Sequence, residues 1–164
     1  MSPAKERSGA AKEAKPKRKS PLLRSGLEVL EHGLWHFDRT DTPTDLKFAI
    51  MHVDQAIELF LKEKVRASGK SINKPKNSKE TLGLYSLYDI LEKELGCSIP
   101  EKADLELLHE ERNAIQHKYL NPSAEDASFH IGNGVAFIAR FLREELDENV
   151  YDYVPSRFLD EFLD

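Results

Sequence analysis

Apolar residues recur at helical spacing along most of the chain. The first stretch carries a large apolar side chain every three or four positions, at Leu23, Leu27, Leu30, Leu34 and Phe37. The second begins at Thr42-Pro43, a cap residue followed by proline, with Asp45 placed to complete a capping box. Its stripe covers four turns and consists of Leu46, Ala49, Ile50, Val53, Ala56, Ile57, Phe60 and Leu61. Both stretches predict amphipathic helices.

The second half of the chain continues this periodicity. A third stripe, over residues 84–95, stops before Gly96, a residue that suits a helix C-terminus. A fourth stripe contains Leu105, Leu108, Ile115 and Tyr119, and a fifth, after Asn121-Pro122, contains Ala127, Ile131, Gly134, Ile138, Phe141 and Leu142. Gly134 is expected to let two helices approach closely. We find no sustained strand-like alternation, and the polar, basic residues 69–78 predict a loop. The pattern predicts an all-α fold, an up-and-down helical bundle of four to five helices.

Three segments follow from the distribution of apolar and charged residues. Residues 1–20 hold seven basic and two acidic residues among Ala, Pro and Ser, which predicts a disordered basic tail. Residues 21–147 form the predicted helical bundle. Residues 148–164 predict an acidic C-terminal extension with a short helix, whose apolar edge should dock onto the bundle and consists of Phe158, Leu159, Phe162 and Leu163.

Composition narrows the class of protein further. The chain has 164 residues and one cysteine, Cys97, so neither an internal disulfide nor a CxxC metal site is available. No apolar run approaches the roughly 20 residues of a membrane span, and the N-terminus lacks the apolar centre of a signal peptide. We therefore expect a soluble, cytoplasmic protein without a membrane partner. Nothing in the sequence indicates a cofactor.

Arg112 interrupts the apolar stripe of the fourth predicted helix. A guanidinium at such a position must be paired with an acid, such as Glu58, or must face a cleft or an interface. Asn113 and His117 are four residues apart and so lie on one helical edge. Arg112 and His117 are five residues apart, which is about 140° around an ideal helix. A shared site would therefore need the long arginine side chain to reach around the helix, the helix to end near His117, or a second subunit to contribute.

The segment Arg112-Asn113-Ala114-Ile115-Gln116-His117 resembles the R-x4-6-H signature of HEPN domains, in which a polar residue often follows the arginine. The stretch from His52 to Lys62 is also similar to the second-helix region of several HEPN families. The resemblance covers residues from about 45 to 145. It implies a metal-independent endoribonuclease with a toxin–antitoxin, phage-defence or RNA-processing role. It also implies a homodimer with the motif at or near the interface, and an antitoxin or regulatory protein partner is a further possibility.

The residue types fit that chemistry. Imidazole titrates near neutrality, so His117 is our candidate general acid and base for the 2′-hydroxyl and the leaving 5′-oxygen. A guanidinium offers a planar fork of donors to phosphate oxygens, so Arg112 is the candidate stabiliser of developing charge. Asn113 is the candidate orienting residue. The resemblance implies cleavage through a 2′,3′-cyclic phosphate.

A basic segment could guide RNA towards these residues by charge alone. The alternative is that the segment is a solvated, lysine-rich loop without a ligand. The candidate RNA-binding residues are Lys62, Lys64, Arg66, Lys70, Lys74, Lys76 and Lys79, together with Lys118.

Other interpretations of the same residues stay open. Tyr119 gives the spacing R-x4-H-x-Y, which resembles HEPN toxins whose tyrosine is an AMPylation target, but its place in the apolar stripe favours core packing. His109-Glu110 begins like a zinc-protease motif, but Asn113 stands where the second histidine is needed, so a metal site is not expected. The stronger alternative is a non-catalytic HEPN-like helical module that binds a partner protein, RNA or a nucleotide.

Overall fold

The computed structural model describes residues 18–39 and 42–163. Most of the predicted basic tail lies outside the described residues. The four long helices are α1 (Pro21–Arg39), α2 (Pro43–Ala67), α4 (Lys102–Lys118) and α5 (Ala124–Glu145). Shorter elements are β1 (Asn73–Lys74), β2 (Asn77–Thr81), α3 (Leu84–Asp89), a π-helical turn (Ile90–Glu94), a 3₁₀ turn (Val150–Asp152) and α6 (Ser156–Leu159).

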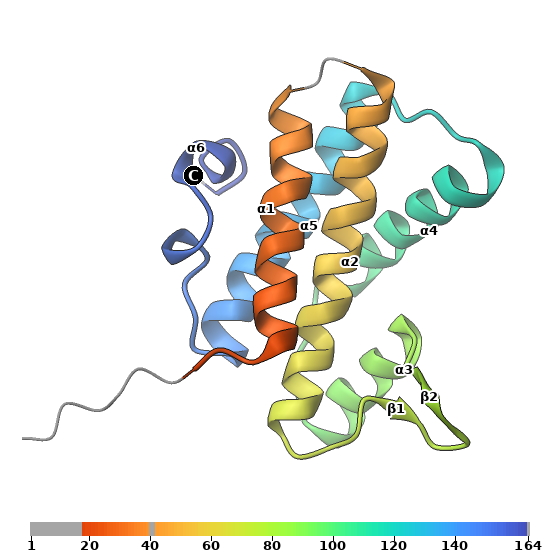
Figure 1. The fold of residues 1–164 in the computed structure, drawn as a ribbon, viewed down its shortest axis with the longest axis vertical. Coiled ribbons are helices and arrows are strands. Elements are labelled where there is room, and N and C mark those ends of the chain that lie inside the picture. Colours follow the sequence, from red (N-terminus) through yellow and green to blue (C-terminus); the bar gives the residue numbers. More distant parts are fainter. Residues whose placement is uncertain (1–17, 40–41, 164) are drawn as a thin grey trace, which may run out of the picture.

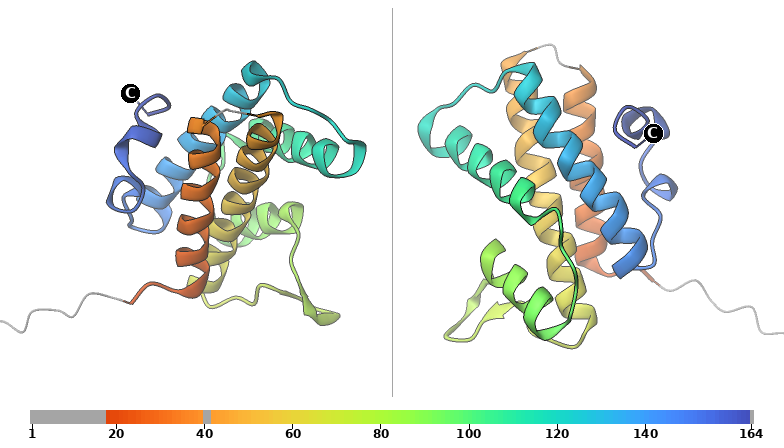
Figure 2. Two further views of the ribbon diagram at one scale, coloured as in Figure 1. Left: turned by 45° about the horizontal axis from the view of Figure 1, so that its top comes forward. Right: turned by 180° about the vertical axis from the view of Figure 1, so that it is seen from behind.

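The long helices pack as a bundle, which confirms the predicted all-α fold. In Figure 1, α1 and α2 run antiparallel and side by side, α5 lies behind them, and α4 is inclined away from the bundle. The turned views in Figure 2 show the same order. The predicted stripes of α1, α2 and α5 supply the core, because their residues are buried almost throughout. Of the helices in the described parts of the chain, none combines the length and apolar character needed to cross a membrane.

The start of α2 follows the predicted capping chemistry. Backbone N–H of Asp45 donates to Oγ1 of Thr42 at 3.3 Å, and backbone N–H of Thr42 donates to Oδ2 of Asp45 at 3.2 Å. This capping box satisfies two backbone donors that a helix start otherwise leaves open. The same carboxylate accepts from Nδ1 of His36 at 2.8 Å and so links α1 to α2. That hydrogen bond is the largest cause of a lowered pKa of Asp45.

Gly134 sets the spacing between α5 and its neighbours. A Cβ atom at this position would lie 2.7 Å from Cγ1 of Val53 on α2 and 3.2 Å from Cδ2 of Leu108 on α4. Only a residue without a side chain fits here, which confirms the predicted close approach of helices. The contact brings Val53 and Leu108 to one level of the bundle. The residues that follow them, Asp54 and His109, therefore meet.

The predicted loop at residues 69–78 is only partly irregular. Residues 73–81 form an antiparallel hairpin in which Asn73 pairs with Thr81 and Lys74 with Asn77. Both strands are fully exposed, so no alternation of buried and exposed side chains marks them in the sequence. The third predicted helix also differs, because its second half is a π-helical turn. It ends as expected at Gly96, whose φ is 64°.

The C-terminal residues pack onto the bundle, as expected for their apolar edge. Phe158 and Leu159 of α6 are buried in the same core as the long helices. The rings of Phe37 on α1 and Phe162 lie 5.5 Å apart between centroids. Val150 and Val154 add further buried side chains from the turn before α6. The extension is therefore part of the core and not a free appendage.

Candidate functional site

Helix α4 carries the motif residues and is anchored by its apolar face. Leu105, Leu108 and Ile115 are buried against α2 and α5. After Ile115 the helix leaves the bundle, and residues 116–120 are exposed. Figure 1 shows this end of α4 and the hairpin on the same side of α2, a relationship that the rear view in Figure 2 repeats. The motif therefore runs from the core to a projecting helix end.

A buried carboxylate on α2 is the central feature of the site. Asp54 is only 4% exposed and accepts from Nδ1 of His109, which lies 3.0 Å from Oδ2 and 3.2 Å from Oδ1. Nε of Arg112 lies 3.8 Å from the same Oδ2. Because a buried carboxylate needs positive partners and donors, these two residues of α4 hold it in place. Asp54 was not predicted as a site residue, although an acid at the edge of an otherwise apolar stripe was a signal.

The pair also sets the protonation of His109. The hydrogen bond to Asp54 is the largest cause of a raised pKa of His109, above its ordinary value of 6.5, while burial and the charge of Arg112 act against it. A carboxylate only accepts, so Nδ1 carries a proton in either protonation state of the ring. Asp54 therefore fixes the tautomer of His109 and favours its charged form.

Arg112 lies between the buried carboxylate and Asn113. Its side chain is 32% exposed, and Nη1 donates to Oδ1 of Asn113 at 2.9 Å. The acid that it faces is Asp54 and not Glu58, which instead pairs with Lys62 at 2.7 Å. The alternative of a pairing with a core-facing acid therefore holds, but the acid is Asp54, one turn nearer to the start of α2 than the example of Glu58. The guanidinium is tethered on two sides and partly open to solvent.

Two hollows are lined by residues of the motif. The α2–α4 hollow has a volume of about 380 Å³, and its lining includes Phe48, His52, Asp54, Gln55 and Arg112. The α4-end hollow, about 450 Å³, is lined by Glu110, Asn113, Ala114, His117 and Lys118. Arg112 and His117 thus face different hollows within one chain, as their spacing along the helix predicts. Asn113 connects them, because it contacts Arg112 and lines the hollow of His117.

Tyr119 does not continue the apolar stripe. The side chain is 88% exposed, and its backbone has a φ of 56°, in the left-handed region. The expectation of core packing is therefore wrong, because α4 ends at Lys118 and the chain turns away from the bundle. An exposed phenol is open to modification, and AMPylation of Tyr119 stays a prediction.

The basic segment is largely neutralised by acids. Lys62 is buried and contacts Glu58 and Thr81, and Lys64 lies 3.2 Å from Glu145. Other cations of the segment pair in the same way: Arg66 with Glu63, Lys70 with Glu94 and Lys74 with Glu80. Sequence separation hid the pairs with Glu145 and Glu94, whereas the other three acids lie within six positions of their partners. RNA binding by this segment stays a prediction that depends mainly on the exposed residues Lys76, Lys79 and Lys118.

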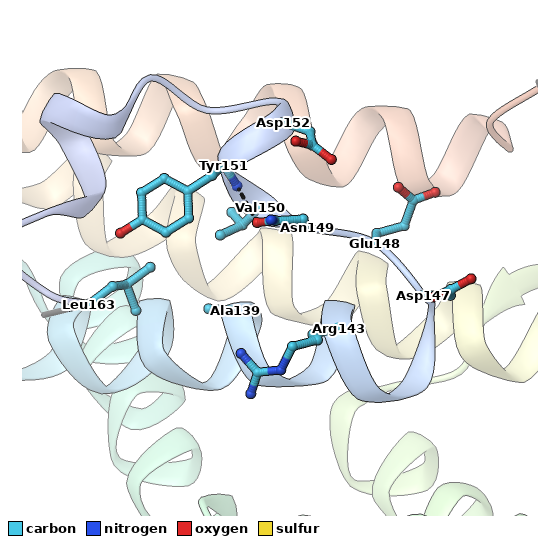
Figure 3. Close-up of a pocket in the computed structure, with 9 residues that line it drawn as sticks. All are labelled: Ala139, Arg143, Asp147, Glu148, Asn149, Val150, Tyr151, Asp152 and Leu163. Carbon is cyan, nitrogen blue, oxygen red and sulfur yellow. Dashed lines mark hydrogen bonds between the residues drawn. The ribbon is translucent and has the colours of Figure 1, made fainter.

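A larger hollow lies away from the motif. Figure 3 shows the lining of this hollow, with Ala139 and Arg143 of α5 on one side and the loop that carries Asp147, Glu148 and Asp152 on the other. Three carboxylates against one guanidinium disfavour a phosphate there. Among residues 18–39 and 42–163, no group of three or more His, Cys, Asp or Glu side chains is arranged to hold a metal ion. None of the motif residues on α4 lines this larger hollow.

Comparison of the chain with known protein families, with curated proteins and with solved structures gave no match.

Proposed function

We propose that this chain is a metal-independent endoribonuclease of the HEPN type that acts as a homodimer. The observation that carries the proposal is the tether at Arg112. Asn113 accepts from Nη1 at 2.9 Å and Asp54 lies 3.8 Å from Nε, so the guanidinium is oriented before any substrate arrives. Preorganised donors stabilise developing charge without reorganisation during the reaction. A third of the Arg112 side chain is open to solvent, which leaves the guanidinium accessible to a phosphate.

In the proposed reaction, His117 accepts the proton of a ribose 2′-hydroxyl, and the resulting oxygen attacks the adjacent phosphorus. The bond from phosphorus to the 5′-oxygen breaks, and protonated His117 returns the proton to that leaving oxygen. Arg112 stabilises the negative charge on the phosphorane. The products are a 2′,3′-cyclic phosphate and a 5′-hydroxyl. Asn113 acts as a positioning residue.

A second subunit completes this site in the proposal. His117 is exposed on a projecting helix end, and it faces a different hollow from Arg112 of its own chain. Two copies that meet along this end of α4 would bring His117 of one chain towards Arg112 of the other. The role in the cell, whether toxin, phage defence or RNA processing, and any antitoxin or regulatory partner belong to the same proposal.

The test is cleavage of an end-labelled RNA with EDTA present. We expect a 2′,3′-cyclic phosphate product from the wild-type chain and a rate at least about 100-fold lower in Arg112→Ala and in His117→Ala. Gln116→Ala, an exposed neighbour in the same turn, is the matched control and should retain full activity. Cleavage that survives in His117→Ala would remove the assignment.

Mixing the two inactive variants tests the dimer. A mixed dimer of Arg112→Ala and His117→Ala chains contains one intact arginine and one intact histidine on different chains. Restored cleavage is expected if the site is shared between subunits. If cleavage stays absent although the wild-type chain is active, the site lies within one chain.

The alternative is a non-catalytic module that binds a partner protein, RNA or a nucleotide. The separation of Arg112 and His117 into two hollows favours it, because one chain alone does not assemble the reacting groups. It predicts RNA or partner binding without any cleavage by the wild-type chain. The assay above therefore separates the two functions.

A further inference from the structure

Five aromatic rings gather on the outer side of α1 and α2. His32, Trp35 and His36 come from α1, and Phe48 and His52 come from α2. The ring centroid of His32 lies 4.6 Å from that of His36 and 4.8 Å from that of His52. The ring centroids of Trp35 and His36 lie 5.0 Å apart. Phe48 lies 5.1 Å from His36 and 6.0 Å from His52. We refer to these five residues as the ring cluster.

The ring cluster is not part of the core. Trp35 is 37% exposed and Phe48 is 41% exposed, and His32 is exposed as well. Two large aromatic side chains, each more than a third exposed, lie on adjacent helices and so form an apolar patch that is open to a ligand. Cζ of Arg39 lies 4.6 Å from the centroid of Trp35, which places positive charge beside the cluster.

The rings meet because the two helices touch at Gly33. A Cβ atom there would lie 2.8 Å from Cβ of His52 and 3.3 Å from the backbone oxygen of Ala49. Two rings are also fixed by hydrogen bonds. Nδ1 of His36 donates to Asp45 at 2.8 Å, and Nδ1 of His52 donates to the backbone oxygen of Phe48 at 2.6 Å. A set of rings held this way loses little conformational freedom when a flat ligand stacks on it.

The ring cluster is continuous with the candidate site. Phe48 and His52 line the α2–α4 hollow together with Arg112 and Asp54. The ring of His52 lies nearly parallel to that of His36, with 12° between their planes and 6.0 Å between their centroids. The ring of His36 in turn contacts that of Trp35. A row of rings therefore leads from the guanidinium to the outer face of α1. Ring faces next to a cation are the combination that binds single-stranded nucleic acid.

We propose that the ring cluster is a base-stacking subsite for single-stranded RNA, which holds bases adjoining the phosphate at Arg112. The inference rests on the proposed function, because the RNA enters through the chemistry assigned to Arg112 and His117. Stacking on aromatic rings tolerates any base, so the subsite adds affinity without selecting a sequence. Removal of one stacking ring should weaken RNA binding about tenfold.

The test uses the intrinsic fluorescence of Trp35, the single tryptophan of the chain. The His117→Ala chain is titrated with a six-nucleotide single-stranded RNA, so that no cleavage disturbs the equilibrium. The comparison probe is an abasic oligonucleotide with the same number of phosphates. We expect the RNA to quench Trp35 emission and to bind tighter than the abasic probe, which should leave the emission unchanged.

Variants separate the ring cluster from other aromatic side chains. Phe48→Leu should weaken binding of the RNA about tenfold and leave binding of the abasic probe unchanged. Tyr151→Leu removes an equally exposed ring at the C-terminal end of the chain and is the matched control, with no effect on either probe. Equal affinity for RNA and the abasic probe, or an unchanged Phe48→Leu variant, would overturn the subsite.

The two proposals fail in different ways. Cleavage by the wild-type chain without quenching of Trp35 would leave the nuclease in place and remove the subsite. Quenching and a weakened Phe48→Leu variant without any cleavage would support the subsite and assign the chain to RNA binding alone.

Discussion

Nδ1 of His109 lies 3.0 Å from Oδ2 of Asp54, and this contact joins α4 to α2 at the level of the motif. Arg112, one turn further along α4, approaches the same oxygen at 3.8 Å. One buried carboxylate thus orients two side chains of α4. The orientation of the guanidinium, and with it the proposed chemistry, depends on that carboxylate.

The first prediction concerns the titration of His109. In the wild-type chain its pKa should lie above 6.5, and Asp54→Asn should lower it, because the hydrogen bond to the carboxylate is the largest cause of the raised value. Proton NMR of the imidazole as a function of pH measures both. Glu110→Gln, which removes an exposed charge next to His109, is the control and should have little effect. An unchanged His109 titration in Asp54→Asn would contradict the assigned cause.

The same pair predicts how stability depends on pH. A group whose pKa is raised on folding stabilises the folded state fully below its unfolded pKa, and this contribution disappears as the pH rises through the folded pKa. Asp54→Asn should therefore lower the free energy of unfolding by about 1–3 kcal/mol at pH 5.5 and by less at pH 8.5. Urea denaturation at the two pH values measures the difference. A larger loss at pH 8.5 would reverse the sign of the linkage.

Gly134 and Gly132 make a matched pair on α5. Gly134→Ala should cost about 1–3 kcal/mol of unfolding free energy, because the added methyl would lie 2.7 Å from Cγ1 of Val53. Gly132→Ala should be neutral or stabilising by up to about 1 kcal/mol, since its nearest neighbour, Cδ1 of Phe162, lies at 3.5 Å and alanine favours the helix. Chemical denaturation ranks the two variants. Equal stability would show that α5 can move away from α2.

Tyr119 ends α4 in a left-handed conformation that glycine adopts without strain. Tyr119→Gly should raise the free energy of unfolding by about 1 kcal/mol, because the exposed ring contributes little packing. Lys118→Gly, one residue earlier and still in the helix, should lower it by about 0.5–1 kcal/mol. Chemical denaturation should therefore show changes of opposite sign in the free energy of unfolding of the two variants. A destabilised Tyr119→Gly variant would indicate that the phenol has a contact that matters.

Salt dependence tests the remaining basic surface. Replacing both Lys76 and Lys79 by Gln should reduce the slope of log affinity for single-stranded RNA against log salt by about 1.4, or about 0.7 for each lost phosphate contact. Lys64→Gln should change the slope less, because Lys64 already pairs with Glu145. Filter binding or fluorescence anisotropy at several salt concentrations measures the slopes. An unchanged slope in the double variant would remove this surface from RNA binding.

Much of the fold was predictable because its signals are local. The Thr42 cap, the stripe on α2 and the stop at Gly96 act over one or two helical turns, so periodicity and cap chemistry identify them. The hairpin at 73–81 was missed because its strands lie in solvent on both faces and show no alternation. Tyr119 was wrongly predicted to pack in the core, because its spacing fits the apolar stripe of the helix. The helix ends one residue before it, so the side chain is exposed.

The sequence by itself determined the helices, their buried faces and the motif on α4, since residues three or four apart on a helix share a face whatever surrounds them. Only the tertiary structure decided that Asp54 is the partner of His109 and Arg112, and that two rings of the cluster, Phe48 and His52, share a hollow with that arginine. The reason is geometric. Asp54 and His109 are 55 positions apart, and their contact depends on the rotation and depth of packing that Gly134 permits between α2, α4 and α5.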